Sequence, residues 1–371
     1  MKPDTTILKQ VIDLLLKKSF PFAVYKHPDN DECCVVVQTQ QVHLVHNIAE
    51  ICDMSGFLIT PFEPAKEGLS YFIKNDLSAC NRDDYVAILK KLKNITSNSN
   101  EVCNNNAYEI GKKEYLAKIN FLVQKLKNRD LDKVVLSRVK TVNREPEFST
   151  SDFFIRLAKK YPKAFTYLFY IPGTGVWTGA TPEILLSQKD DGSTVIMSLA
   201  GTAPIENSKQ IIWGEKEKVE QRYVTEFIRA KLSELKIDRF TEEPPKTVTA
   251  GSIAHIQTIF RIYDKNHRKR VVDLINTLHP TPAVCGLPQT DAFELIKNIE
   301  PHDRKFYTGF LGPWMLNGKS DLFVNLRCAE IGSNKINLFI GGGLTADSDP
   351  EKEWEETELK AQTILSVLRE K

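Results

Sequence analysis

The chain lacks the long apolar runs of membrane proteins and the basic blocks of nucleic-acid-binding proteins. Its 371 residues include no run of about 18 uncharged apolar residues, the length that a membrane-spanning helix requires. The 50 lysines and arginines nearly balance the 48 aspartates and glutamates, for a net charge of +2, and no basic patch stands out along the chain. We therefore expect no membrane segment and no nucleic-acid partner.

Cysteine spacings typical of disulfide frameworks and zinc ribbons are also absent. The seven cysteines are odd in number, Cys33 and Cys34 are adjacent, and no CxxC pair occurs. Reduced thiols in a cytoplasmic protein are therefore the expected state. Charged residues interrupt the apolar residues of the first 20 positions, which indicates an amphipathic helix and not a signal peptide.

Hydrophobic periodicity predicts a mixture of strands and helices. Strands are expected at residues 34–37, 133–139, 165–171, 176–178, 195–199, 321–328 and 335–340, and helices at 115–126, at about 215–235 and from Asp349-Pro350 to the C-terminus. Because strands and helices do not alternate strictly, the predicted class is α+β. Residues 94–106 are rich in Asn, Ser and Thr, which is typical of a surface linker.

The last predicted helix carries charge on the face that should be buried. Glu353, Glu356 and Lys360 lie three and four positions apart, and the same face continues into apolar residues. Buried charges are unfavourable unless they are paired or bind a metal ion. A flexible run of three glycines at 341–343 precedes this helix. Together these features suggest a metal-assisted site for an anionic substrate.

Glu220 is a third candidate carboxylate. It lies four residues before Val224, on the apolar side of the helix predicted at 215–235. A glutamate in the first turn that interacts favourably with the helix dipole would explain it equally well if it stood alone. Beside Glu353 and Glu356, a shared site is the better interpretation, and a set of oxygen ligands suits Mg²⁺.

Lys133 and Glu183 are candidates for proton transfer. Lys133 begins a predicted strand, where it is either an edge lysine that prevents aggregation or a desolvated, neutral lysine that acts as a base. Glu183 ends the turn Gly179-Ala180-Thr181-Pro182-Glu183, which Gly and Pro would fix. It is either a solvated acid or a general acid held on a rigid turn.

Arg327 and His255 have less specific surroundings. Arg327 is predicted in mid-strand, as a surface residue or as a fork for a carboxylate. His255 has no neighbour at metal-ligand spacing, so structural hydrogen bonding is its expected role.

These motifs occur in a fixed order along the chain, and on them it resembles the chorismate-utilising enzymes, most closely the isochorismate synthases. The motifs are Lys133–Arg138, Gly179–Glu183, Leu199–Thr202, the Glu220 helix, Leu278–Pro288, Asp303–Gly309, the Arg327 strand and Gly341–Lys360. The resemblance implies large antiparallel sheets with helices packed outside and a central cleft. Residues 1–110, which match loosely, would complete the fold around the catalytic region 111–371, as one interleaved domain.

The resemblance also implies a role for each candidate residue. Lys133 would be the base that activates water for attack at C2 of chorismate, and Glu183 the acid that protonates the departing C4 hydroxyl. Mg²⁺ would be held by Glu220 and Glu356, with Glu353 adjacent or bridged by water. The substrate would contact Ala200, Gly201, Thr202, His255, Ala283, Val284, Tyr307, Leu326, Arg327, Phe339, Gly341, Gly342, Gly343 and Lys360.

At two positions the chain differs from related enzymes that do not use water as the nucleophile. Anthranilate synthases carry Gln where Lys133 stands, and aminodeoxychorismate synthases often carry Lys where Ala200 stands. Salicylate synthases share the Lys–Glu pair, so elimination of pyruvate after isochorismate formation stays open. A catalytically inactive binding protein would be expected to have lost Lys133, Glu183 or a metal carboxylate, and all are present.

Further expectations concern partners and departures from the family. The chain contains no glutaminase region, so no glutaminase subunit is expected, and the protein would be a monomer or homodimer. Its product would feed menaquinone or siderophore biosynthesis. Gln221 stands where relatives often carry a His beside the metal carboxylate, a departure that would alter metal affinity. Cys285 is expected to pack in the core.

Overall fold

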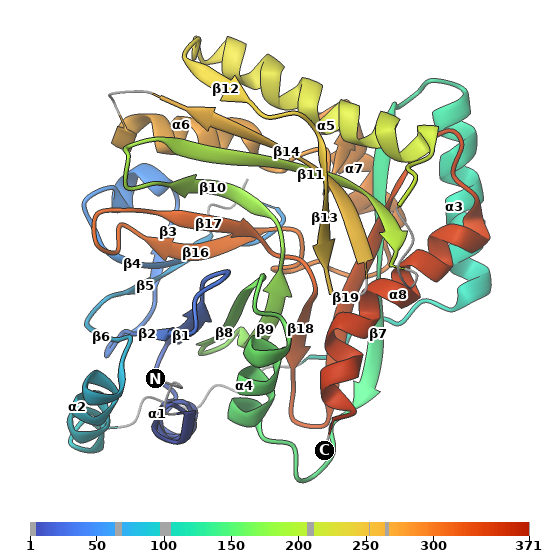
Figure 1. The fold of residues 1–371 in the computed structure, drawn as a ribbon. Coiled ribbons are helices and arrows are strands. Elements are labelled where there is room, and N and C mark those ends of the chain that lie inside the picture. The colour runs from blue at the N-terminus through green and yellow to red at the C-terminus, as the bar shows by residue number, and fades with distance from the viewer. Residues whose placement is uncertain are drawn as a thin grey trace.

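Two large antiparallel sheets face each other, and helices cover their outer sides (Figure 1). This computed structural model describes residues 5–63, 69–96, 105–205, 211–251, 253–263 and 267–370. Within these ranges one sheet has nine strands and the other has ten. The predicted α+β class is confirmed.

The nine-stranded sheet is built from strands far apart in the sequence. Its order is β15 (Gly286–Leu287), β7 (Lys133–Asn143), β19 (Lys335–Leu344), β18 (Cys328–Ile331), β9 (Gly175–Thr181), β8 (Phe165–Ile171), β1 (Phe22–Lys26), β2 (Cys33–Val37) and β6 (Leu77–Ala79).

The ten-stranded sheet follows the same principle. Its order is β12 (Phe240–Glu242), β14 (Ile253–Ile262), β11 (Thr194–Pro204), β10 (Ile184–Gln188), β17 (Asp321–Val324), β16 (Phe310–Trp314), β4 (Gly56–Thr60), β5 (Ser70–Lys74) and β3 (His43–Val45), with β13 (Lys246–Ala250) paired to β14.

Strands from the N-terminal part take part in both sheets. β1, β2 and β6 extend the nine-stranded sheet, whereas β3, β4 and β5 extend the ten-stranded sheet. The domain boundary near residue 110 stays a prediction. Residues 97–104 of the predicted linker lie outside the described ranges.

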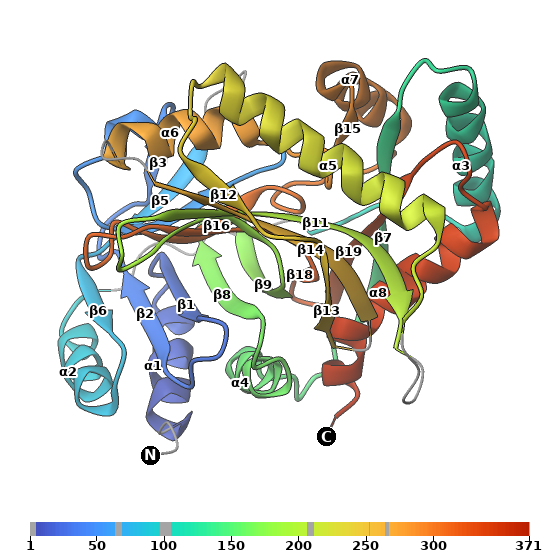
Figure 2. The ribbon, with the colours of Figure 1, turned by 45° about the horizontal axis from the view of Figure 1, so that its top comes forward.

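The helices form two layers outside the sheets (Figure 2). α1 (Thr5–Lys17), α2 (Arg82–Lys93) and α4 (Thr150–Lys160) pack on the nine-stranded sheet, together with α3 (Lys112–Lys127), α7 (Gln289–Ile299) and α8 (Pro350–Leu368). α5 (Glu215–Glu234) and α6 (His267–Leu278) pack on the ten-stranded sheet, with a short 3₁₀ helix at Ile48–Ile51. No helix in the described ranges is both long and apolar enough to cross a membrane.

An aromatic core fills the space between the sheets. Phe165 of one sheet stacks on Phe323 of the other with 4.0 Å between ring centroids. Trp177, Phe169 and Tyr167 continue this layer from the same sheet. Such large rings bury much apolar surface, and they hold the two sheets in a fixed relation around the cavity described below.

The single strand predicted at 321–328 is wrong. The segment forms two strands, β17 and β18, which belong to different sheets. Between them Asn325 is fully buried, donates to the Phe306 carbonyl and accepts a hydrogen bond from the Tyr167 hydroxyl. Arg327 then adopts a left-handed backbone with φ of 50°, which ends the alternation and turns the chain from one sheet into the other.

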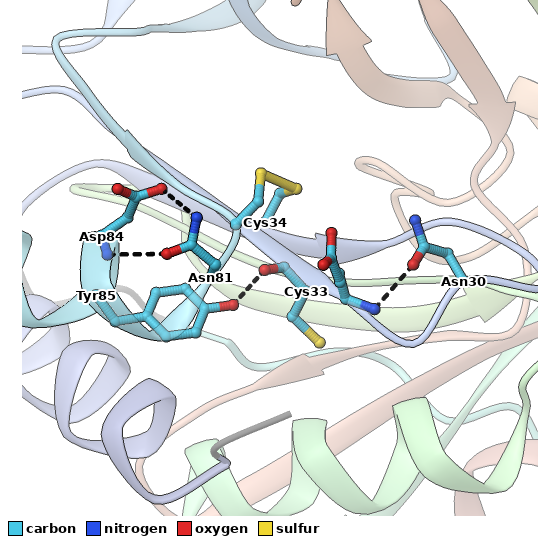
Figure 3. Close-up of a disulfide and its surroundings, with 8 residues drawn as sticks. Asn30, Cys33, Cys34, Asn81, Asp84 and Tyr85 are labelled. Atoms are coloured by element: carbon cyan, nitrogen blue, oxygen red, sulfur yellow. Dashed lines mark hydrogen bonds between the residues drawn. A yellow bond between two sulfur atoms is a disulfide. The ribbon is translucent and has the colours of Figure 1, made fainter. Parts of the chain in front are cut away.

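The expectation of reduced thiols is wrong for one pair. Cys34 of β2 and Cys80, which follows β6, form a disulfide (Figure 3). The pairing of Val35 with Ala79 in neighbouring strands brings the two cysteines together. Nearby, the Tyr85 hydroxyl of α2 donates to the Cys33 carbonyl. Cys33, Cys285 and Cys328 are buried thiols, and packing is therefore the observed role of Cys285.

Candidate active site

One cavity brings together nearly all of the predicted site residues. It lies where β19, β11, β14, α5 and α8 meet. The predicted residues that line it are Glu183, Ala200, Gly201, Thr202, Glu220, His255, Ala283, Val284, Tyr307, Leu326, Arg327, Phe339, Gly341, Gly342, Gly343 and Lys360. Lys133 and Glu356 do not line it but pair with Glu220 and Lys360, which do, and Glu353 pairs with Lys216 outside the lining.

Sequence reasoning missed five residues that also line this cavity. They are Val135, Pro182, Leu199, Thr308 and Ile340. Val135 lies two residues after Lys133 on one strand, so alternation could have identified it. Thr308 has a left-handed backbone with φ of 63°, a feature without a sequence signal at a threonine.

The three glycines of β19 let the charged side chains approach the backbone closely. A Cβ atom at Gly343 would lie 2.3 Å from Oε1 of Glu220 and 3.0 Å from Cε of Lys133. A Cβ atom at Gly342 would lie 3.2 Å from Oε2 of Glu353 and 3.8 Å from Oε1 of Glu356. The three carboxylates predicted to bind metal therefore converge on two neighbouring glycines.

Each of these carboxylates faces a lysine. Lys133 Nζ lies 3.0 Å from Glu220 Oε1, and Lys360 Nζ lies 2.6 Å from Glu356 Oε1. The third ion pair joins Lys216 to Oε1 of Glu353. Lys216 was not predicted as a site residue, although it lies one helical turn before Glu220.

Glu353 and Glu356 have opposite electrostatic environments. Burial raises the pKa of Glu353 to about 7, and the charge of Glu356 adds to this effect while Lys216 opposes it. Burial would also raise the pKa of Glu356, but Lys360 and Lys216 outweigh it and lower the pKa. Glu356 is therefore the firmly charged member of the pair at neutral pH.

The donor set fits a divalent cation, but the carboxylates are not arranged as a ready-made metal site. Among the described residues no group of three His, Cys, Asp or Glu side chains forms such a site, and each of the three carboxylates is paired with a lysine. Oε2 of Glu353 is nevertheless buried and makes no hydrogen bond of normal geometry. Three neighbouring carboxylates, one of them with an unsatisfied oxygen, are the ligand type that Mg²⁺ prefers.

Lys133 is completely buried. Its ammonium group is at ion-pair distance from Glu220 but makes no aligned hydrogen bond. Lys133 therefore meets the cavity through Glu220, which lines it.

Glu183 is a buried acid with its proton retained near neutral pH. Its carbonyl accepts a hydrogen bond from the Val324 amide at 3.0 Å, which fixes the turn between β9 and β10. Burial raises the pKa of Glu183 to about 8, against the opposing effects of Lys133, Arg327 and Lys360. A carboxyl group in this state can donate a proton.

His255 and Arg327 form a buried pair at the cavity wall. His255 Nδ1 lies 2.7 Å from the Gly201 carbonyl, so Nδ1 carries the proton and Nε2 accepts from the Arg327 guanidinium at 3.3 Å. Burial, followed by the charge of Arg327, lowers the pKa of His255 to about 3. The imidazole is therefore neutral, and the guanidinium charge remains available to an anion.

α8 is fastened to β7 by Arg138. Its guanidinium centre lies 3.9 Å from the centroid of the Trp354 ring, and Nε donates to the Thr357 hydroxyl at 2.9 Å. A further ion pair joins Arg138 to Glu358. These contacts set the position of Glu353, Glu356 and Lys360 on the same helix.

A second buried arginine, Arg304, holds two residues of the cavity lining in place. Arg304 donates to both carboxylate oxygens of Glu300, at 2.6 and 2.7 Å, and to the carbonyls of Val284 and Val135 at 2.9 and 2.8 Å. Bidentate pairs of this kind are strong and directional. The loop that contains Val284 is thereby held against β7.

Comparisons with known proteins agree with this arrangement. A sequence model of the family described as "Chorismate binding enzyme" matches residues 71–369. Isochorismate synthase EntC of Escherichia coli is 31% identical over 245 residues, which are 64% of this chain and 62% of that enzyme. The matched segment thus spans less than two thirds of the enzyme's length.

A second relative matches over more of both chains. Isochorismate synthase MenF of Haemophilus influenzae is 28% identical over 313 residues, which are 81% of this chain and 71% of that enzyme. Among solved structures, DhbC from Bacillus anthracis has a TM-score of 0.78 at 24% identity and covers 96% of this chain and 99% of its own. This last likeness shows a shared fold.

Proposed function

The chain belongs to the family of chorismate-binding enzymes, and we propose that it is an isomerase that converts chorismate reversibly to isochorismate. The observation that carries the proposal is the protonated, buried Glu183 at the same cavity as the cationic Arg327 and Lys360. Chorismate has two carboxylates and a hydroxyl group that must leave. The cavity offers cations for the first and a proton donor for the second.

In the proposed reaction a water molecule adds at C2 while the C4 hydroxyl leaves as water. The attacking water gives a proton to Lys133, and the departing hydroxyl takes a proton from Glu183, so atoms and charge balance. Each positioned proton-transfer group contributes roughly 10²–10⁴-fold to such a rate. In this account Lys133 acts after its contact with Glu220 has been released.

Binding and orientation would come from the rest of the cavity. Arg327 and Lys360 would hold the carboxylates of the substrate, together with the glycine amides of β19. The apolar side chains of Val284, Leu326 and Phe339, with Tyr307, would pack against the ring. Fixed placement of the reacting groups lowers the barrier by replacing a bimolecular encounter.

We also propose that the cation is Mg²⁺, held by Glu220, Glu353 and Glu356. When bound, it supplies a positive charge that orients and stabilises the substrate carboxylate. The unsatisfied Oε2 of Glu353 and the all-oxygen donor set support this assignment. A cytoplasmic enzyme that is a monomer or homodimer and works without a glutaminase subunit remains part of the proposal.

The test is product analysis with purified protein, chorismate and Mg²⁺, separated by chromatography. We expect isochorismate without pyruvate, and no turnover when a chelator removes the metal ion. Release of pyruvate with salicylate would identify a salicylate synthase instead. Conversion of neither kind, by a folded protein with Mg²⁺ present, would refute the proposed function.

A further inference from the structure

Three lysines pair with the carboxylate cluster of Glu220, Glu353 and Glu356. Of these lysines, Lys216 is the one that has no part in the proposed reaction. It lies in the first turn of α5, where this helix approaches the first turns of α8 (Figures 1 and 2). Its ammonium donates to Oε1 of Glu353. The Lys216 side chain is 24% exposed, whereas that of Glu353 is 2% exposed, so the lysine reaches inward to a buried carboxylate.

The two oxygens of Glu353 are in different situations. Oε1 is occupied by Lys216, and Oε2 is buried without a hydrogen bond of normal geometry. The Ser348 hydroxyl is a further polar neighbour of this carboxylate, but Oε2 is left without a hydrogen-bond partner. Oε2 instead faces Gly342, at the side from which Oε1 of Glu356 also approaches.

A carboxylate with no partner on either oxygen could rotate and point either oxygen inward. The bond from Lys216 to Oε1 removes this freedom and leaves Oε2 directed at the space between Glu353 and Glu356. Groups that orient a metal ligand in this way commonly change metal affinity by about 10–100-fold when they are removed.

We propose that Lys216 is a positioning residue for the cation site, because it holds Oε1 of Glu353 and so presents Oε2 to a divalent cation. This inference rests on the proposed function only in its assumption that the cluster binds such an ion. A lysine that merely occupied the site of the cation would have the opposite effect, since its removal would tighten metal binding.

The experiment is calorimetric titration of the full-length protein with Mg²⁺ alone. Lys216→Met is compared with the wild type, with Lys216→Arg, which keeps a donor, and with Lys218→Met, which removes an exposed lysine from the same turn. Thermal unfolding confirms that each variant is folded. In parallel, the Mg²⁺ dependence of chorismate turnover is measured for each protein.

We expect the Kd for Mg²⁺ to rise about 10–100-fold in Lys216→Met, with a smaller rise in Lys216→Arg and none in Lys218→Met. At saturating Mg²⁺ the kcat of Lys216→Met should approach that of the wild type. An unchanged or lower Kd in Lys216→Met overturns the inference. A wild type that binds Mg²⁺ but does not convert chorismate refutes the proposed function alone, and one that binds no Mg²⁺ refutes the inference and the proposed cation together.

Discussion

Replacing Glu183 by glutamine should make the protein more stable at alkaline pH while it abolishes turnover. In the folded protein burial raises the pKa of the Glu183 carboxyl group to about 8, whereas the ordinary pKa of a glutamate side chain is 4.5. Between these values the unfolded chain binds fewer protons at this position than the folded chain. Stability is therefore full below the unfolded pKa and falls as pH rises toward the folded pKa.

The size of this effect follows from the shift in pKa. At 1.36 kcal/mol for each pKa unit, the wild type should lose about 3–4 kcal/mol of unfolding free energy at this site between pH 5 and pH 8. Glu183→Gln cannot ionise and should not show this loss. The difference between the two proteins is the useful quantity, because effects of the substitution on packing are the same at both pH values.

The assay is urea-induced unfolding of the wild type and Glu183→Gln at both pH values. The reasoning predicts that the variant gains stability relative to the wild type as pH rises. It also predicts that wild-type kcat/KM falls above about pH 8, where the acid loses its proton. Parallel stability curves for the two proteins would refute the claim that burial keeps Glu183 protonated.

Three other substitutions test parts of the site and the fold. Gly343→Ala places a Cβ atom 2.3 Å from Glu220 Oε1, so kcat/KM should fall by at least about 10-fold with little change in Tm. The control is Gly111→Ala, whose added Cβ atom meets nothing within 4 Å. Equal activity of the two variants would contradict the role of Gly343. Arg138→Met should lower the unfolding free energy by about 2 kcal/mol. Lys140→Met removes the more exposed partner of the same Glu358 and should change the unfolding free energy by less than about 1 kcal/mol. Equal losses of the two variants in denaturant unfolding would show that Arg138 does not anchor α8. Reductant should lower the Tm of the wild type but not of Cys34→Ser. The disulfide closes a loop of 46 residues, and a cross-link over such a loop contributes about 4 kcal/mol to the free energy of unfolding. Identical sensitivity of the two proteins to reductant would argue against the bond.

Much of the site could be predicted because its residues lie in local patterns. Glu353, Glu356 and Lys360 repeat at helical spacing, and the helix starts where Asp349 accepts from the Lys352 amide at 3.0 Å. The rigid turn before Glu183 is visible in its Gly and Pro residues. These signals depend on neighbours within a few positions.

Features that depend on distant contacts could not be predicted from the sequence. The bend at Arg327 depends on Asn325, whose partner Tyr167 is 158 positions away. The pairing of Lys216 with Glu353 spans 137 positions, and the Cys34–Cys80 bond requires the pairing of β2 with β6. In each case alternation and composition describe one segment correctly but contain no information about the segment that packs against it.

The central claim is that Lys133 takes a proton from the attacking water while Glu183 gives a proton to the departing C4 hydroxyl. The most direct measurement is mass analysis of the product formed from chorismate in ¹⁸O-labelled water with Mg²⁺. The account predicts isochorismate that carries one ¹⁸O atom at C2, and no product from Lys133→Ala or Glu183→Gln. Unlabelled isochorismate, or labelled product from either variant at the wild-type rate, would contradict it.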